Sequence, residues 1–236
     1  MAFSEFYDNF ISYQIKTGIN DRIYGLYKRV LKAGLPSDSD VLEIGCGIGS
    51  LTRLLVRKIK TGTITSMDIS EKSIQYARSR INRPNIRFHV SDILEFETEL
   101  TFSRILLFDV IEHIPEENHM DLFNRIYGMM NEDALLFINI PNPYHILYDQ
   151  KNKPEELQEI DQPIFINHLA NVLAKASLDM IYFESYSIWV KDDYHYFIVK
   201  KRSEFTEHLV QNDRTVFQRI VARLQREMRQ LIYRYP

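Results

Sequence analysis

The chain of 236 residues has little cysteine, glycine, proline and tryptophan, with one, eight, eight and one residue of each. A single cysteine, Cys46, excludes an internal disulfide and favours a reducing, cytoplasmic compartment. No apolar run reaches the roughly 18 residues needed to cross a bilayer. Glu5 and Asp8 stand where a secretory signal would carry basic residues. We therefore expect a cytoplasmic globular protein without a membrane span.

Basic charge is concentrated at one end of the chain. The net charge is −3, but residues 214–236 hold six arginines against Glu227 alone, which gives +5 and leaves −8 for residues 1–213. Apolar residues recur there at three- and four-residue spacing, which predicts an amphipathic helix of about five turns. They are Phe217, Val221, Leu224, Met228 and Leu231. Such a helix must dock on its own body, pair in a homodimer, or lie on an anionic surface.

The hydrophobic pattern divides the chain into three parts. Residues 3–34 have apolar residues near helical spacing with Gly34 as a stop, so we expect a helical N-terminal lid over residues 1–36. Residues 37–202 alternate β-branched apolar runs with helical segments. The basic amphipathic helix belongs to a third part, residues 203–236.

The central part is expected to be a doubly wound α/β domain around a mostly parallel seven-stranded sheet. Strands are predicted at 41–44, 63–68, 86–90, 104–108 and 134–140, with helices at 51–59, 70–81, 120–130 and 163–176. Ser70 can cap the second of these helices. Two further strands, 179–189 and 194–200, are joined by only four residues. So short a link predicts a hairpin, and hence an antiparallel edge strand.

The stretch VLEIGCGIGSLTRLL, residues 41–55, places three glycines within five positions between a predicted strand and a predicted helix. Such loops hold dinucleotides in one group of enzymes and S-adenosylmethionine in another. Ser50 stands where a dinucleotide fingerprint has glycine or alanine. The Tyr-x-x-x-Lys pattern of short-chain dehydrogenases also fits badly, because Tyr196 and Lys200 would lie on one strand about 13 Å apart. The dinucleotide interpretation is therefore disfavoured.

Four segments in order carry a resemblance to a known family. They are Glu43-Ile-Gly-Cys-Gly-Ile-Gly49, Asp68 at the end of the second strand, Ser91-Asp92-Ile93 after the third, and Phe108-Asp-Val-Ile-Glu-His113 at the end of the fourth. Over about residues 37–140 the chain resembles the class I S-adenosylmethionine-dependent methyltransferases. The last segment is similar to their ubiquinone-biosynthesis and small-molecule branch.

The resemblance implies a cofactor site for S-adenosyl-L-methionine. Glycines 45 and 47 would let the backbone approach the methionine portion, and Glu43 would engage its ammonium group. Asp68 would accept hydrogen bonds from the ribose hydroxyls, although it could also be a helix cap. The full set of expected cofactor residues is Glu43, Gly45, Cys46, Gly47, Gly49, Asp68, Ile69, Asp92, Ile93 and Phe108.

The adenine would be held by the residues that follow the second and third strands. Ile69 would pack on one face of the base, Asp92 would accept from its amino group, and the amide of Ile93 would donate to a ring nitrogen. Asp92 could equally be a turn residue. No metal is expected in the site.

A general base helps methyl transfer when the acceptor must lose a proton. His113 and His145 both follow strands at the carboxyl edge of the predicted sheet, where ligands of such sheets bind. They are the catalytic candidates, although His113 could simply cap or pack its turn.

The expected function is methyl transfer from S-adenosylmethionine to an oxygen or nitrogen of a small molecule or glycan. Tyrosines and Trp189 enrich the second half of the chain and suit a mixed polar and apolar pocket. Methylation of a peptide, protein or nucleic acid is the alternative within the class; nucleic acid is disfavoured by the acidic run 155–161. An NAD-dependent oxidoreductase and a non-catalytic cofactor-binding subunit are the alternatives from other classes.

Overall fold

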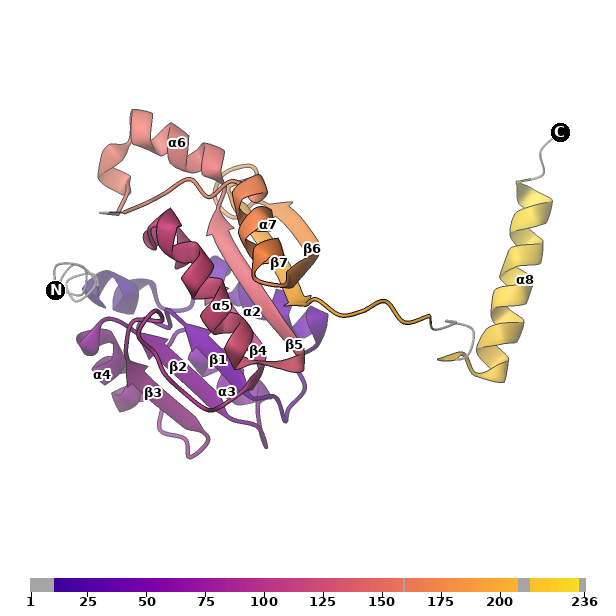
Figure 1. Cartoon of the computed structure of the whole chain (residues 1–236), viewed down its shortest axis with the longest axis horizontal. Helices are drawn as coiled ribbons and strands as arrows, with labels where there is room; N and C mark the ends of the chain where they lie inside the picture. Colours follow the sequence, from indigo (N-terminus) through magenta and orange to yellow (C-terminus); the bar gives the residue numbers. More distant parts are fainter. Residues whose placement is uncertain (1–10, 159, 208–212, 234–236) are drawn as a thin grey trace. The chain divides into compact units, whose positions relative to one another are not determined.

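The computed structural model describes residues 11–158, 160–207 and 213–233 (Figure 1). The chain forms two compact units, Met1–Arg202 and Ser203–Pro236. None of the helices within the described ranges is both long and apolar enough to cross a membrane.

The first unit is built on one seven-stranded sheet in the order β3-β2-β1-β4-β5-β7-β6. Its strands are β1 (Val41–Ile44), β2 (Ile64–Asp68), β3 (Ile86–Val90), β4 (Phe102–Phe108), β5 (Met130–Pro141), β6 (Leu178–Tyr186) and β7 (Tyr194–Lys201). The first five strands pair in parallel. The predicted fold class is confirmed.

The hairpin of β6 and β7 forms one edge of the sheet. The edge strand β6 pairs antiparallel with β7, as predicted, but the strand that runs against the parallel majority is β7, one place in from the edge. The reason is that the second strand of the hairpin, not the first, pairs with β5. The sequence of residues 179–200 does not indicate which strand of the hairpin pairs with β5.

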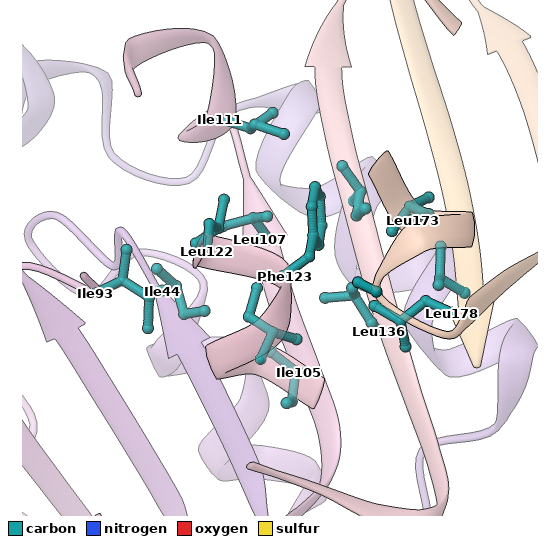
Figure 2. Close-up of a cluster of buried hydrophobic side chains, with 14 of the residues drawn as sticks. Ile44, Ile93, Ile105, Leu107, Ile111, Leu122, Phe123, Leu136, Leu173 and Leu178 are labelled. Atoms are coloured by element: carbon teal, nitrogen blue, oxygen red, sulfur yellow. The ribbon is translucent and has the colours of Figure 1, made fainter. Parts of the chain in front are cut away.

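Helices cover both faces of the sheet (Figure 1). On one face, α5 (His119–Met129) and α7 (Ile166–Lys175) bury apolar side chains against β1, β4 and β5. Figure 2 shows Phe123 of α5 among strand residues such as Leu107 and Leu136. On the other face, α2 (Asp21–Gly34) and α3 (Thr52–Lys58) pack in a second cluster. The packing of helices on both faces defines the doubly wound arrangement.

Two further helices and three short segments belong to this unit. The helix α4 (Glu71–Arg80) begins at Ser70, whose side chain accepts from the Ser73 amide, as the sequence predicts. The helix α6 (Pro143–Asn152) was not predicted. Three short 3₁₀ segments also occur: η1 (Ile111–His113), η2 (Glu116–Asn118) and η3 (Pro154–Glu156).

The N-terminal segment differs from the single helix expected over residues 3–34. Residues 11–17 are helical, and α2 begins only at Asp21. Gly18 between them has φ +59°, and the Asn20 side chain caps α2 by accepting from the Ile23 amide. A left-handed glycine followed by an N-cap ends one helix and starts another. Residues 3–10 of the expected helix lie outside the described residues.

The second unit contains α8 (Val216–Ile232), which confirms the helix predicted in the tail. Thr215 and Gln218 form a capping box in which each side chain accepts from the backbone amide of the other residue. No residue of α8 is buried.

Candidate functional site

A cavity of about 480 Å³ opens at the carboxyl ends of β1 and β4. These neighbouring strands flank the point where the strand order reverses, which is where open α/β sheets bind ligands. Its described lining comes from the N-terminal helices, the glycine loop after β1, the end of β4 and the loop before β7. The residues used below are Gln14, Arg22, Glu43, Gly45, Cys46, Gly47, Phe108, Asp109, Gln158, Trp189 and Tyr194.

The glycine loop is the floor of this cavity. All three glycines are in the left-handed region, with φ +76° at Gly45, +52° at Gly47 and +79° at Gly49. The amides of Gly45 and Cys46 both donate to the Met67 carbonyl, which ties the start of the loop to β2. The positive φ angles explain why glycine is needed at each position.

The space beside each glycine is used differently, and only in part as predicted. A Cβ on Gly45 would collide with Val110, and one on Gly49 would lie 2.9 Å from Ile81 at the end of α4. At these two positions a neighbouring protein side chain already occupies the space that a Cβ would fill. A Cβ on Gly47 would lie 3.1 Å from the terminal amide of Gln14, a flexible group that also lines the cavity.

Glu43 is held by hydroxyl groups. Its carboxylate is 3% exposed and accepts from Thr52 Oγ1 at 2.5 Å and Ser66 Oγ at 2.8 Å, both at Oε2. Burial raises the pKa of Glu43 to about 7, against the opposing effect of these hydrogen bonds. Glu43 lines the cavity as well. Cys46 beside it is buried, and burial raises the pKa of its thiol.

Asp68 connects the glycine loop to the start of α4. Its Oδ2 accepts from the Gly47 amide at 2.7 Å, and its Oδ1 accepts from the Ser70 amide at 2.9 Å. The N-cap of α4 is Ser70, so the alternative in which Asp68 itself caps that helix does not apply.

None of the residues expected around the adenine is among the described residues that line the cavity. Asp92 is exposed, and its Oδ1 accepts from the Leu94 amide. This geometry is typical of a turn residue, which was the alternative to a role in adenine binding. Ile93 is 4% exposed and belongs to the core, and Ile69 is half-buried. Phe108, in contrast, lines the cavity at the end of β4.

Asp109 is a cavity residue that the expected set omits. It has φ +54°, an uncommon backbone conformation for a residue with a side chain. Its Oδ2 lies 2.6 Å from Arg22 Nη1, and its Oδ1 accepts from Asn139 Nδ2 at 2.7 Å. Burial alone would lower the pKa of Arg22, but the Asp109 carboxylate and the Tyr194 hydroxyl together raise that pKa. The position of Asp109 at the end of a predicted strand was the available sequence signal.

Aromatic side chains form one wall. Trp189 and Tyr194 contact each other edge to face, with 5.9 Å between ring centroids, and the Arg22 guanidinium lies about 6 Å from both rings. Burial raises the pKa of the Tyr194 phenol, which therefore stays neutral at physiological pH. The sequence had singled out these aromatics as suited to a mixed pocket, and both line the cavity.

Three buried polar atoms of the lining have no hydrogen-bond partner among the described residues. They are Gln14 Oε1, Arg22 Nε and Gln158 Oε1. Buried polar atoms in proteins nearly always have partners. Convergence of two acceptors and a donor on one cavity is therefore the pattern expected where a polar ligand binds.

Neither catalytic candidate is among the described residues that line the cavity. His113 Nδ1 lies 2.6 Å from the Ile160 carbonyl and 3.2 Å from Asp161 Oδ1. Burial would lower the pKa of His113, but Asp161 and the neighbouring Glu112 raise it to about 9. An imidazole with that pKa is protonated at neutral pH and cannot accept a proton. His145 Nε2 lies 3.4 Å from Asp149 Oδ2 on the same helix.

The fold and the cavity together define a doubly wound α/β protein with a cavity at the switch point of its sheet. Residues 41–133 match the model of a family described as a methyltransferase domain. This match agrees with the resemblance of the sequence motifs to the class I S-adenosylmethionine-dependent methyltransferases. The chain spans about a third of the length of the first curated relatives that it matches.

Two relatives illustrate the range of names in this family. The (S)-tetrahydroprotoberberine N-methyltransferase of Eschscholzia californica is 29% identical over 111 residues, 46% of this chain and 31% of that protein. Malonyl-(acyl-carrier protein) O-methyltransferase 1 of Ilyobacter polytropus is 24% identical over 194 residues, 71% of this chain and 69% of that protein.

Solved structures agree with the fold. The N-methyltransferase NodS of Bradyrhizobium japonicum WM9, solved with S-adenosyl-L-homocysteine, has a TM-score of 0.64 at 18% identity. The match covers 78% of this chain and 91% of that one. At this level of identity the likeness concerns the fold.

Proposed function

We propose that the protein transfers a methyl group from S-adenosyl-L-methionine to a nitrogen or oxygen of a small molecule. The observation that carries the proposal is the cavity of about 480 Å³, which is lined by residues of the glycine loop together with Asp109, Arg22, Trp189 and Tyr194. Its volume lies in the range of small-molecule pockets, roughly 300–1,000 Å³. The names of both relatives, one an N-methyltransferase and one an O-methyltransferase, support the reaction class.

The cofactor side of the site is proposed to be the set expected from the sequence. Asp68 at the end of β2 would accept hydrogen bonds from the ribose hydroxyls, and Ile69, Asp92 and Ile93 would surround the adenine. Glu43, Cys46, the three glycines and Phe108 would surround the methionine portion. The unpartnered Gln14 Oε1 beside Gly47 suits a ligand ammonium group. When bound, the cofactor supplies an electrophilic methyl group on a sulfonium.

The acceptor side is proposed to lie between the Arg22–Asp109 pair and the wall of Trp189 and Tyr194. Because Asp109 is neutralised by Arg22, the site favours a neutral acceptor with an aromatic or apolar part that can lie on this wall. Gln158 Oε1 would accept a hydrogen bond from the acceptor. A glycan or a peptide segment that reaches the same wall is an alternative acceptor.

The proton of the acceptor needs no histidine in this proposal. His113 is protonated and turned to Asp161, and His145 pairs with Asp149. A neutral amine can attack the methyl group through its lone pair and lose its proton afterwards to water. The chain's contribution is then to orient the acceptor and to exclude water. A cytoplasmic location for the reaction stays a prediction.

Titration calorimetry with S-adenosylmethionine, S-adenosylhomocysteine and NAD tests the cofactor. We expect both sulfur ligands to bind and NAD not to. Binding of NAD alone would support the oxidoreductase alternative and overturn the proposal. Transfer of labelled methyl to a panel of neutral amines and phenols tests the activity. Binding without transfer to any amine, phenol, glycan or peptide would support a non-catalytic subunit.

A further inference from the structure

The apolar side chains of α8 are exposed along one side of the helix. Successive residues turn by about 100°, which brings the large apolar side chains into one arc of about 120°. They are Phe217, Ile220, Val221, Leu224, Met228, Leu231 and Ile232. Phe217 is 74% exposed and Leu224 is 56% exposed. An arc this wide exceeds the narrow seam of a two-stranded coiled coil.

The opposite side of α8 is basic. The same rotation places Arg219, Arg223, Arg226 and Arg229 together, away from the apolar arc. Glu227 is the one acidic residue of the helix and already pairs with Arg223 at 3.0 Å. Most of the arginine charge is therefore not balanced within the helix, and an anionic surface would complement it.

We propose that α8 lies on the surface of a bilayer that contains anionic phospholipids. The apolar arc would enter the boundary between headgroups and acyl chains, and the long arginine side chains would reach the phosphates. A membrane surface uses both faces of the helix at once. A second copy would bring the same positive charge, and 17 residues make fewer than the three heptads expected of a stable coiled coil.

The lipid test uses the whole chain and vesicles of two compositions, pure phosphatidylcholine and phosphatidylcholine with about 30% phosphatidylglycerol. Flotation is expected to show at least about tenfold stronger binding to the anionic vesicles. Raising the salt concentration should weaken that binding, because the phosphate contacts are screened. Equal binding to both vesicles, or binding to neither, would overturn the proposal.

Two pairs of variants separate the faces of the helix. Leu224→Gln with Met228→Gln removes apolar contact, and Arg219→Gln with Arg226→Gln removes charge. Each pair should weaken binding to anionic vesicles at least about tenfold. Arg219→Lys with Arg226→Lys is the matched control and should retain binding. If the apolar pair binds vesicles like the unchanged chain, the contact is electrostatic only and the proposal fails.

Measurements without lipid test the other occupants of the apolar face. Light scattering should give the mass of one chain, and the apolar pair should leave that mass and the melting temperature unchanged. A dimer that the apolar pair dissociates would show that a second copy covers the face. A melting temperature lowered by the apolar pair at unchanged mass would show that the helix docks on its own chain. Either result would overturn the lipid proposal.

Discussion

The guanidinium of Arg22 and the carboxylate of Asp109 form an ion pair, with 2.6 Å between Nη1 and Oδ2. Arg22 belongs to α2 and Asp109 follows β4, so the pair joins the N-terminal helices to the carboxyl edge of the sheet. Both residues line the cavity. The ion pair therefore holds the N-terminal helices, which line one side of the cavity, against the carboxyl edge of the sheet.

Removing both partners should destabilise the protein by less than the two single changes added together. Arg22→Gln leaves Asp109 without its counter-charge, and Asp109→Asn leaves Arg22 in the same state. A fully buried pair would cost about 3–5 kcal/mol, and because these side chains are 28% and 16% exposed we expect about 1–3 kcal/mol for each change. The double variant should lose less than the sum. Urea unfolding of the four proteins measures the coupling, and strictly additive losses would contradict it.

Gly47→Ala should weaken cofactor binding through the backbone and the neighbouring Gln14. At φ +52° a side chain costs about 1–2 kcal/mol, and the new methyl group would press on the Gln14 amide. We expect a loss of about tenfold in affinity for S-adenosylhomocysteine, measured by calorimetry. Gly128→Ala is the control, because its Cβ meets nothing within 4 Å. An unchanged affinity in Gly47→Ala would remove Gly47 from the proposed site.

Asp68→Ala should reduce the affinity for S-adenosylmethionine and S-adenosylhomocysteine equally. The change removes the proposed acceptor of the ribose hydroxyls, worth about 1.5–3 kcal/mol or roughly ten- to hundredfold. Asp40→Ala is a matched control, because Asp40 Oδ1 also accepts two hydrogen bonds, from the Thr63 amide and hydroxyl, but lies before β1. The control should be less stable yet bind normally. Equal losses in both variants would point to a structural role for Asp68.

The features predicted correctly from the sequence are those set by residues close together in the chain, such as strands, helices and helix caps. Every strand and most helices were found because apolar periodicity is local, and Ser70 acts as the predicted cap. The helix α6 was missed although Asn142 caps it and Pro143 occupies its first turn. That pair is a recognised helix start, but no helix was predicted there from the sequence.

Contacts between distant segments were beyond the sequence. Nothing local indicates that Arg22 meets Asp109, or that Val110 occupies the space beside Gly45. The two histidines were chosen because both follow strands at one edge of the sheet. Their side-chain directions depend on Asp161 and Asp149, and such packing has no signature in strand spacing. The conformation of the glycine loop is more predictable, because a local run of glycines sets it.

The last prediction concerns how stability depends on pH near His113. The pKa of His113 rises from 6.5 to about 9 on folding, despite burial, because Asp161 and Glu112 favour the charged ring. The folded protein therefore binds more protons than the unfolded chain between these values. The stabilisation is complete below about pH 6.5 and is lost as the pH rises toward 9.

Urea unfolding at a series of pH values should show a decrease of about 1–3 kcal/mol over this interval, and His113→Gln should flatten it. Glu112→Gln is the companion variant, because burial raises the pKa of Glu112 from 4.5 to about 8, so its ionisation lowers stability as the pH rises between these values. Cofactor affinity and turnover should change little in His113→Gln. A loss of turnover of about a hundredfold or more at unchanged cofactor affinity and stability would instead restore His113 as a general base.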